Sequence, residues 1–162
     1  MPRAARWFGL SVLVIFLDYL TKIAVLASFS PGESRALAPF FNLVLVFNKG
    51  AAFSFLASAG GWQTPLLAAI AVSVSCIIGF LIVRNSEKRL FSFGLALILG
   101  GALGNLYDRL VYGQVVDFLD FHAAGWHWPA FNVADAAITA GAALLILEGF
   151  LHRDGERREK QA

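Results

Sequence analysis

Two long stretches of this sequence contain no charged residue. One runs from Pro65 to Val83 over 19 residues, and the other runs from Leu90 to Tyr107 over 18 residues. A helix needs about 20 mostly apolar residues to cross the hydrocarbon core of a bilayer. Both stretches therefore predict transmembrane helices, and a chain that contains them is a membrane protein rather than a water-soluble one.

Two further apolar stretches contain a few charged residues. Residues 7–29 include Asp18 and Lys22, and residues 133–151 include Asp135 close to their start and Glu148 close to their end. The composition favours reading both as spans, because 58% of the 162 residues are hydrophobic and only 15% are charged, compared with about 25% charged residues in soluble domains. The sequence therefore predicts one polytopic domain over residues 1–162, with four spans at about 7–29, 65–83, 90–107 and 133–151.

The first span has an alternative interpretation as a secretory signal peptide. Arg3 and Arg6 precede its apolar run, and Val25-Leu26-Ala27 resembles a cleavage site, which are two marks of such a segment. Asp18 and Lys22 argue against this alternative, because they interrupt the apolar run before that site.

The basic residues predict how the spans are oriented. Nine of the 13 lysines and arginines precede the first span, lie between the second and third, or follow the fourth: Arg3, Arg6, Arg84, Lys88, Arg89, Arg153, Arg157, Arg158 and Lys160. Short cytoplasmic loops carry an excess of Lys and Arg. Both termini are therefore predicted to be cytoplasmic, and the loops over about 29–64 and 108–132 to face outward.

The outer loops predict a small β-structure at the membrane surface. The β-rich run Phe40–Phe47 is followed by the turn signal Asn48-Lys49-Gly50 and a second short apolar run, Ala51–Phe55. This pattern favours a hairpin, and the alternative is an interfacial amphipathic segment with no sheet. Trp126 and Trp128 in the second outer loop fit an interfacial aromatic belt. The predicted fold class is an all-α membrane protein with four transmembrane helices and a small extracytoplasmic β-hairpin or sheet.

Polar residues from four segments gather at the predicted outer boundary. They are Asp18 and Lys22 in the first span, Asn105, Asp108 and Arg109 at the end of the third, Asp117 in the loop that follows, and Asn132 and Asp135 at the start of the fourth. Asn132 has an alternative role as an N-cap, Asp18 and Lys22 as a structural ion pair, and Asp108 and Arg109 as a solvated surface pair. Because ionisable groups in membrane spans are expensive to bury, the cluster as a whole predicts a functional site.

Two members of this cluster, Asp117 and Asp135, suggest a specific chemistry. Both are flanked by apolar residues and are joined by a short loop. Two carboxyl groups held close together in a low-dielectric site share one proton. The ionised group can take a proton from water while the protonated group hydrogen-bonds a scissile carbonyl, as in an aspartic protease. The alternative is a small membrane transporter that uses the paired aspartates to bind a cation.

Other chemistry-bearing residues offer little. Cys76 is the only cysteine, which excludes an intramolecular disulfide, and we expect it to be a small buried hydrophobe. His122 and His127 have no partners at the spacing of a metal site. We therefore expect no metal or other cofactor, and no nucleic-acid partner.

Five blocks of the sequence together match the motifs of one known family: Asp18-Tyr19-Leu20-Thr21-Lys22, Asn48-Lys49-Gly50-Ala51-Ala52-Phe53-Ser54, Gly100-Gly101-Ala102-Leu103-Gly104-Asn105-Leu106-Tyr107-Asp108-Arg109, Val115-Val116-Asp117-Phe118 and Phe131-Asn132-Val133-Ala134-Asp135. The blocks follow the order of that family's motifs and span nearly the whole chain, with no departure at a motif position. By these blocks the chain resembles the bacterial lipoprotein signal peptidases, also called signal peptidase II.

The resemblance implies an aspartic endopeptidase of the bacterial inner membrane, with Asp117 and Asp135 as the catalytic pair. It implies a prolipoprotein substrate that is cut just before a diacylglyceryl-modified cysteine, contact with membrane lipid, and inhibition by globomycin-type cyclic peptides. Residues at the other motif positions are implied to bind substrate or support the site: Asp18, Lys22, Asn48, Gly50, Asn105, Arg109 and Asn132. We expect Asn48 and Arg109 to hold substrate carbonyls, Asn105 and Asn132 to orient the aspartates, and Phe53 and Phe55 to contact the lipid.

Overall fold

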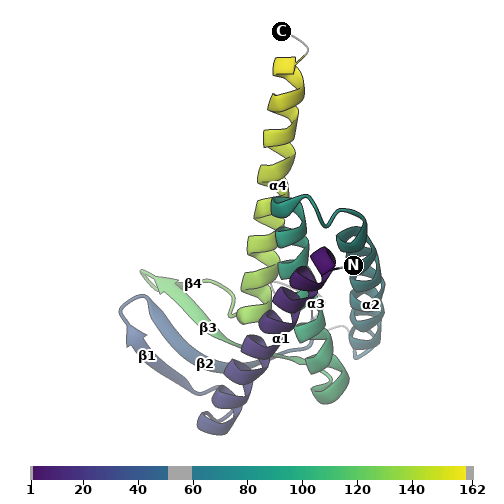
Figure 1. The fold of residues 1–162 in the computed structure, drawn as a ribbon. Helices are drawn as coiled ribbons and strands as arrows, with labels where there is room; N and C mark the ends of the chain where they lie inside the picture. Colours follow the sequence, from purple (N-terminus) through teal and green to yellow (C-terminus); the bar gives the residue numbers. More distant parts are fainter. Residues whose placement is uncertain (1, 51–59, 160–162) are drawn as a thin grey trace.

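Four long helices form the body of the computed structural model, which describes residues 2–50 and 60–159 (Figure 1). The helices are α1 (Pro2–Ser28), α2 (Gln63–Arg84), α3 (Arg89–Tyr112) and α4 (Val133–Glu159). In the described part of the chain, all four are long and apolar enough to cross a membrane, over Arg3–Ser28, Gln63–Arg84, Arg89–Tyr112 and Val133–Leu151. The four predicted spans are thus confirmed as helices, with boundaries that differ by a few residues.

Helix α3 lies at the centre of the bundle and packs against the other three helices. Its glycines allow this close approach. A Cβ atom at Gly100 would lie 2.6 Å from Val14 Cβ of α1, and a Cβ atom at Gly101 would collide with the carbonyl oxygen of Ala134 in α4. Small residues let membrane helices approach through their backbones, where packing replaces the hydrophobic effect as the driving force.

The connections between helices form one antiparallel sheet of four strands, in the order β1-β2-β3-β4. The strands are β1 (Ser34–Ala38), β2 (Phe41–Asn48), β3 (Val115–Ala123) and β4 (Trp126–His127). In the register of β2 and β3, Val46 lies opposite Asp117 and Asn48 opposite Val115. Two loops that are far apart in the sequence thereby become one platform.

The predicted hairpin differs from the observed sheet. Strand β2 is confirmed, but its hairpin partner is the preceding strand β1 rather than the segment that follows it. The other edge of β2 pairs with β3. The turn signal at Asn48–Gly50 was expected to join β2 to Ala51–Phe55, which lie outside the described residues. The expected alternative, an outer loop with no sheet, is wrong.

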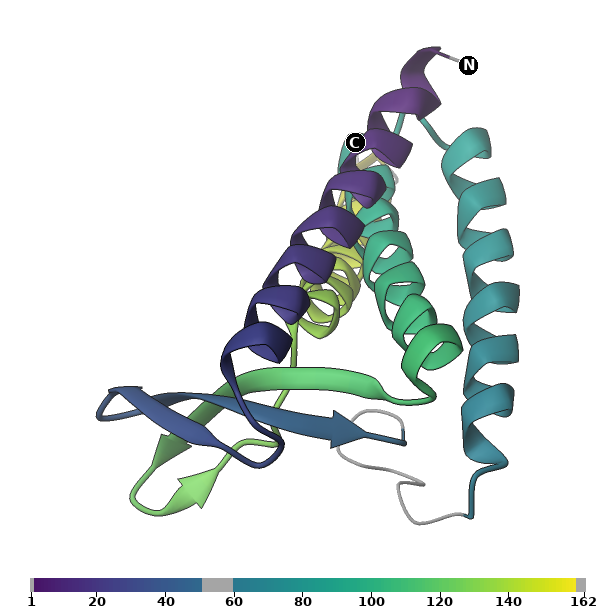
Figure 2. The ribbon, with the colours of Figure 1, turned by 90° about the horizontal axis from the view of Figure 1, so that it is seen from below.

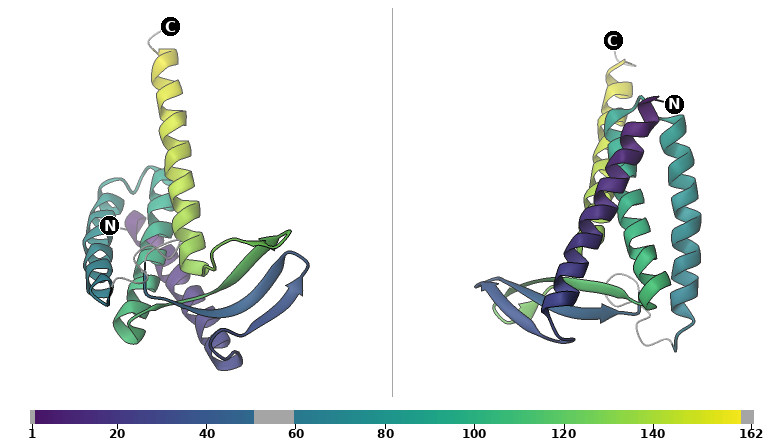
Figure 3. Two further views of the ribbon diagram at one scale, coloured as in Figure 1. Left: turned by 180° about the vertical axis from the view of Figure 1, so that it is seen from behind. Right: turned by 60° about the horizontal axis from the view of Figure 1, so that its bottom comes forward.

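The sheet lies across one end of the bundle, and the start of α1 and the end of α4 lie at the other end (Figures 2 and 3). An apolar cluster joins the sheet to the end of α1. It contains Val25 of α1, Leu45 of β2, and Val116 and Phe118 of β3, all buried. This cluster holds the platform in a set position relative to the helices, which positions the residues that β3 contributes to the site.

The placement of Cys76 corrects one expectation from the sequence. Its side chain is exposed on the surface of α2, whereas a small buried hydrophobe was expected. Helix α2 packs mainly against α3, so most of its apolar surface faces away from the protein. In a membrane such a surface faces lipid, which accepts a cysteine as readily as a protein core does.

Candidate active site

Asp117 and Asp135 reach the same place from two elements. Asp117 lies in β3 and is 2% exposed, and Asp135 lies in the first turn of α4. An isolated antiparallel bridge between Leu119 and Phe131 ties the chain before α4 to β3. That bridge places the start of α4 beside the aspartate of the strand.

Asn132 connects the two aspartates. Its Nδ2 donates to Asp117 Oδ1 at 2.7 Å, and its Oδ1 accepts a bond from the backbone N–H of Asp135 at 2.9 Å. The expected alternative, that Asn132 is an N-cap of α4, is therefore correct as far as it goes, because a side-chain oxygen that accepts this N–H is what an N-cap provides. The same amide also fixes the position of Asp117, so the two roles coexist.

Two further asparagines donate to the aspartates. Asn105 Nδ2 donates to Asp135 Oδ1 at 2.7 Å, and Asn48 Nδ2 donates to Asp117 Oδ2 at 3.1 Å. Asn48 Oδ1 accepts a bond from the backbone N–H of Gly50 at 2.8 Å. In the register of β2 and β3, Asn48 is the diagonal neighbour of Asp117 on the same face of the sheet, which brings long side chains into contact.

The environment of Asp117 favours its protonated form. Burial is the main cause, and the negative charge of Asp135 adds to it, so that the pKa of Asp117 rises to about 7. Hydrogen bonds from Asn48 and Asn132 oppose this rise because they stabilise the carboxylate. A carboxyl group with a pKa near neutrality, next to a second carboxyl group, is the arrangement in which two aspartates share one proton.

Behind the aspartates lies a buried ion cluster of Asp18, Lys22 and Asp108. Lys22 Nζ is 2.7 Å from Asp18 Oδ2 and 2.7 Å from Asp108 Oδ2, and all three side chains are at most 3% exposed. Asp18 Oδ1 accepts a bond from the backbone N–H of Ala134 at 2.9 Å, and Asp108 Oδ2 accepts one from Val116 at 3.0 Å. The cluster therefore ties α1 and α3 to the two segments that carry the aspartates.

The sequence placed Asp108 in the polar group at one end of the spans, but did not count it among the residues that bind substrate or support the site. Its alternative as a solvated pair with Arg109 is wrong, because Asp108 is 2% exposed and is paired with Lys22. Its position three residues after Asn105 was the available signal, since residues three apart share one face of a helix.

Arg109 lies half-buried beside the aspartates and lines the same cavity as Asp135. Its Nη2 donates to the backbone oxygen of Gly50 at 3.0 Å, and its Nη1 donates to the backbone oxygen of Asn105 at 3.2 Å. The structure thus brings together all nine residues that the sequence nominated: Asp18, Lys22, Asn48, Gly50, Asn105, Arg109, Asp117, Asn132 and Asp135.

A cavity of about 720 Å³ begins at this site and extends along the helices. Asn48, Asn105, Arg109 and Asp135 line its polar part. The remainder is apolar and is lined by residues of α2, α3 and α4, including Ile70, Val74, Ala102, Ala136, Ala140 and Ala143. An apolar cavity with a few convergent polar groups is the usual form of a binding or active site.

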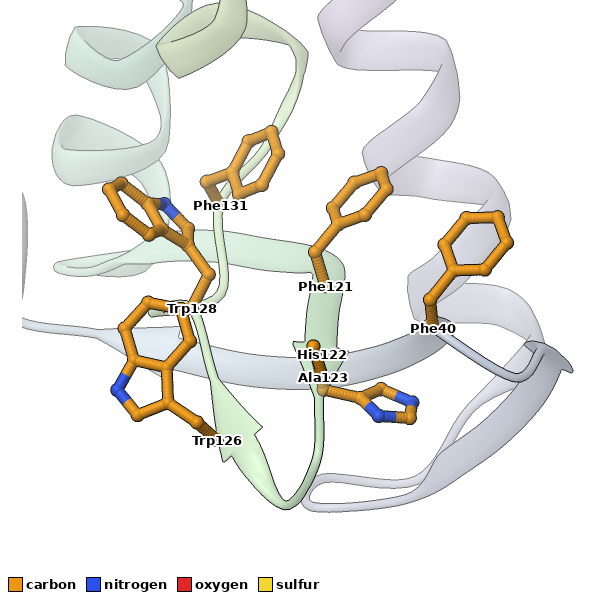
Figure 4. Close-up of a pocket in the computed structure, with 7 residues that line it drawn as sticks. All are labelled: Phe40, Phe121, His122, Ala123, Trp126, Trp128 and Phe131. Atoms are coloured by element: carbon orange, nitrogen blue, oxygen red, sulfur yellow. The ribbon is translucent and has the colours of Figure 1, made fainter.

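A second hollow, of about 420 Å³, lies beside the first and shares Trp128 and Phe131 with it. Phe40, Phe121 and Trp126 also line it, and the rings of Phe40, Phe121 and Phe131 project from the sheet toward the helices (Figure 4). We call this hollow the aromatic groove. It contains the two tryptophans that the sequence assigned to an interfacial belt.

The histidines of β3 and β4 lie outside the aspartate site. His127 Nδ1 is 2.8 Å from Asp120 Oδ1, and Asn42 Nδ2 donates to Asp120 Oδ2 at 2.8 Å. Within the described part of the chain, no group of three His, Cys, Asp or Glu side chains could hold a metal ion. The chemistry that this site offers is therefore that of carboxyl groups, amides and one guanidinium.

Comparison with known proteins assigns a family to this arrangement. The family model described as signal peptidase (SPase) II matches residues 10–151. A lipoprotein signal peptidase of Burkholderia mallei (strain SAVP1) is 57% identical over 153 residues, which cover 94% of this chain and 92% of the relative. A lipoprotein signal peptidase of Paraburkholderia phymatum is 56% identical over the same length, with the same coverage of both chains.

Two solved structures share the fold of this chain. A bacterial membrane enzyme determined by the in meso method at 2.3 Å resolution superposes with a TM-score of 0.83 and 27% sequence identity, over 94% of this chain and 91% of that one. A second bacterial membrane enzyme, determined at 1.9 Å, gives a TM-score of 0.77 over 89% of this chain and 92% of that one. The arrangement of helices and sheet is therefore shared with membrane enzymes.

Proposed function

The chain belongs to the signal peptidase II family, and we propose that it cleaves prolipoproteins by an aspartic mechanism in which Asp117 and Asp135 are the catalytic pair. The family is one of bacterial proteases, and this membership favours peptide cleavage over the cation transport that the paired aspartates alone would also allow. One observation carries the aspartic mechanism: three asparagines fix two neighbouring carboxyl groups, and one of the two, that of Asp135, lines the polar end of an otherwise apolar cavity.

The proposed reaction uses one proton shared by the pair. The ionised carboxylate takes a proton from a water molecule as its oxygen attacks the scissile carbonyl carbon, and the protonated carboxyl group donates a hydrogen bond to the carbonyl oxygen. When the C–N bond breaks, the amine leaves with a proton from the pair. The raised pKa of Asp117, to about 7, supports this scheme because it keeps one proton on the pair near neutral pH.

The polar residues around the pair divide into two roles in this proposal. Asn105 and Asn132 orient the aspartates, as the sequence predicts, and their bonds to Asp135 and Asp117 support this. Asn48 was expected to hold a substrate carbonyl, but its Nδ2 already donates to Asp117, so we assign it to the same orienting role. Arg109 lines the cavity and has more N–H groups than its two backbone partners use, so it is proposed to hold a substrate carbonyl.

The shape of the cavity supports a substrate that arrives from the bilayer. Its apolar walls come from α2, α3 and α4 and extend away from the aspartates along the spans. A diacylglyceryl-cysteine is confined to the bilayer by its acyl chains, at about 0.8 kcal/mol for each buried CH₂. We therefore propose that the cut falls just before that cysteine, and that globomycin-type cyclic peptides inhibit by occupying the same cavity. The expected lipid contacts of Phe53 and Phe55 lie outside the described residues.

The proposed location follows from charge and from the aromatic groove. We propose that this multi-pass bacterial membrane protein lies in the inner membrane with both termini in the cytoplasm and the sheet at the outer face. The predicted excess of Lys and Arg on the side of the termini supports this orientation. The aromatic groove supports it too, because Trp126, Trp128 and the neighbouring phenylalanines form the kind of surface that is enriched at a membrane boundary (Figure 4).

The test of this proposal is cleavage of one purified precursor with and without its diacylglyceryl group, in the same micelles. We expect the modified precursor to be cut just before the cysteine, with a kcat/KM at least about 100-fold above that of the unmodified form, which is about 2.7 kcal/mol in transition-state stabilisation. Equal rates for the two forms would show that the lipid is not recognised. A cut elsewhere in the chain would show that the cavity does not position this bond.

A further inference from the structure

Lys22 is a fully buried cation that donates a hydrogen bond to Asn105, a residue of the site. Its ammonium group has three N–H donors, and three acceptors surround it: Asp18 Oδ2 and Asp108 Oδ2 at 2.7 Å, and Asn105 Oδ1 at 3.1 Å. Every donor therefore has a partner, and an ammonium group has no acceptor to offer. Any atom that faces Lys22 at hydrogen-bond distance must itself be an acceptor.

This requirement fixes the orientation of the Asn105 amide. The oxygen and nitrogen of an asparagine side chain are nearly the same size, so their positions are decided by hydrogen-bond partners. With Oδ1 toward Lys22, Nδ2 of Asn105 donates to Asp135 Oδ1 at 2.7 Å. With the amide turned over, an NH₂ group would face the ammonium, and a carbonyl oxygen would face the Asp135 carboxyl group.

Asn132 reinforces the same orientation. Its Nδ2 lies 3.2 Å from Asn105 Oδ1 and 3.2 Å from the backbone oxygen of Val116. Its own amide is held by Asp117 Oδ1, which accepts a bond from Nδ2 at 2.7 Å, and by the N–H of Asp135, which donates to its Oδ1. Two donors therefore converge on Asn105 Oδ1, and Lys22 is the one that carries a charge.

We propose that Lys22 is a positioning residue of the peptidase reaction: anchored between Asp18 and Asp108, its ammonium group holds the Asn105 amide with the NH₂ toward Asp135. This role rests on the proposed function, because it acts only through the catalytic pair. It gives the buried ion cluster a purpose beyond joining helices, since a misplaced reacting group costs about 100-fold in rate.

A double-mutant cycle tests the proposal. The variants are Lys22→Met, Asn105→Ala and the two combined, assayed on the lipid-modified precursor. If Lys22 acts through Asn105, we expect Lys22→Met to lower kcat by at least about tenfold with KM changed less than about twofold, and the combined variant to be no slower than Asn105→Ala alone. Losses that multiply in the combined variant would overturn the proposal, because Lys22 would then act independently of Asn105.

A second measurement keeps the proposal testable if Lys22→Met does not fold. The side-chain NH₂ resonance of Asn105 in ¹⁵N-labelled wild-type protein is identified by its loss in Asn105→Ala. Because Nδ2 is proposed to face Asp135, this resonance should shift in Asp135→Asn. An unchanged resonance would contradict the amide orientation itself. Inactivity of the wild-type protein, or full activity of Asp117→Asn, would instead contradict the proposed function. Failure of the proposed function can therefore be told apart from failure of the role proposed for Lys22.

Discussion

Replacing Asp117 by asparagine should stabilise the folded protein at alkaline pH, although we expect it to abolish cleavage. Burial and the neighbouring charge of Asp135 raise the pKa of Asp117 from 3.8 to about 7 in the folded state. At about 1.36 kcal/mol for each pKa unit, ionised Asp117 destabilises the folded state by about 4 kcal/mol. An asparagine at this position places an NH₂ group against the donors of Asn48 or Asn132, which costs about 1–3 kcal/mol. The net gain expected above about pH 8 is therefore about 1–3 kcal/mol.

The sign of this effect changes with pH in a defined way. A carboxyl group whose pKa is raised by folding carries no penalty below its unfolded pKa, where it is protonated in both states. The penalty grows between about pH 4 and about pH 7 and is constant above that. The difference in unfolding temperature between Asp117→Asn and the wild-type protein, measured in one detergent across this range, should therefore rise with pH by a few degrees.

Asp120→Asn, in the same strand, is the matched control. Burial alone would raise the pKa of Asp120, but hydrogen bonds from His127 and Asn42 outweigh it, so that this pKa lies below its usual value. Its carboxylate therefore stabilises the folded state above its unfolded pKa, and this contribution is lost as the pH falls through the folded pKa. Asp120→Asn should lower the unfolding temperature at neutral pH and have no effect in acid. Equal unfolding temperatures for wild type and Asp117→Asn at every pH would refute the reasoning about the buried pair.

Other consequences concern packing, topology and metals. Gly101→Ala should destabilise the protein by about 1–3 kcal/mol, because a Cβ there would collide with the Ala134 carbonyl and lie 2.7 Å from Ile138 Cγ1. Gly9→Ala should be tolerated, because a Cβ there would have nothing within 4 Å. Equal unfolding temperatures for these two variants would refute this expectation. In a Cys76→Ser background, Ser34→Cys should react with a membrane-impermeant thiol reagent in intact spheroplasts and Lys88→Cys only after the membrane is opened; the reverse pattern would invert the proposed orientation. A chelator such as EDTA should leave cleavage unchanged, because no group of three His, Cys, Asp or Glu side chains in the described part of the chain could hold a metal ion. An activity that EDTA removes and a divalent ion restores would contradict this.

The spans could be predicted because the bilayer imposes its requirements locally. Residues 65–83 and 90–107 have to be apolar along their whole length, so the signal lies in the run itself. The predicted orientation of the spans then places Asp18, Asn105 and Asp135 at the same depth in the membrane. Depth alone could bring these residues to one boundary, and the structure shows that Lys22 and Asn132 join them in one network of ion pairs and hydrogen bonds.

The sheet was harder to predict because its pairing is non-local. Strand β2 pairs with β3, which begins at Val115, 67 positions after the last residue of β2, Asn48. No local sequence pattern encodes the register of such a distant pair. The turn signal at Asn48–Gly50 does mark a tight local bond, between Asn48 Oδ1 and the Gly50 N–H. Its use is to aim the Asn48 side chain at Asp117, which a hairpin pattern does not reveal. Strand β1 could not be predicted from its composition, because it lacks the β-branched residues that favour strands.

The proposed catalytic role of the two aspartates is tested most directly by cleavage of a lipid-modified precursor by purified Asp117→Asn and Asp135→Asn, with Asp120→Asn as the control. Sharing one proton requires both carboxyl groups, so each of the first two variants should show no cleavage above background while remaining folded and inserted in micelles. Asp120 lies outside the cavity of the pair, so its variant should retain substantial activity. Full activity in either Asp117→Asn or Asp135→Asn would contradict the aspartic mechanism.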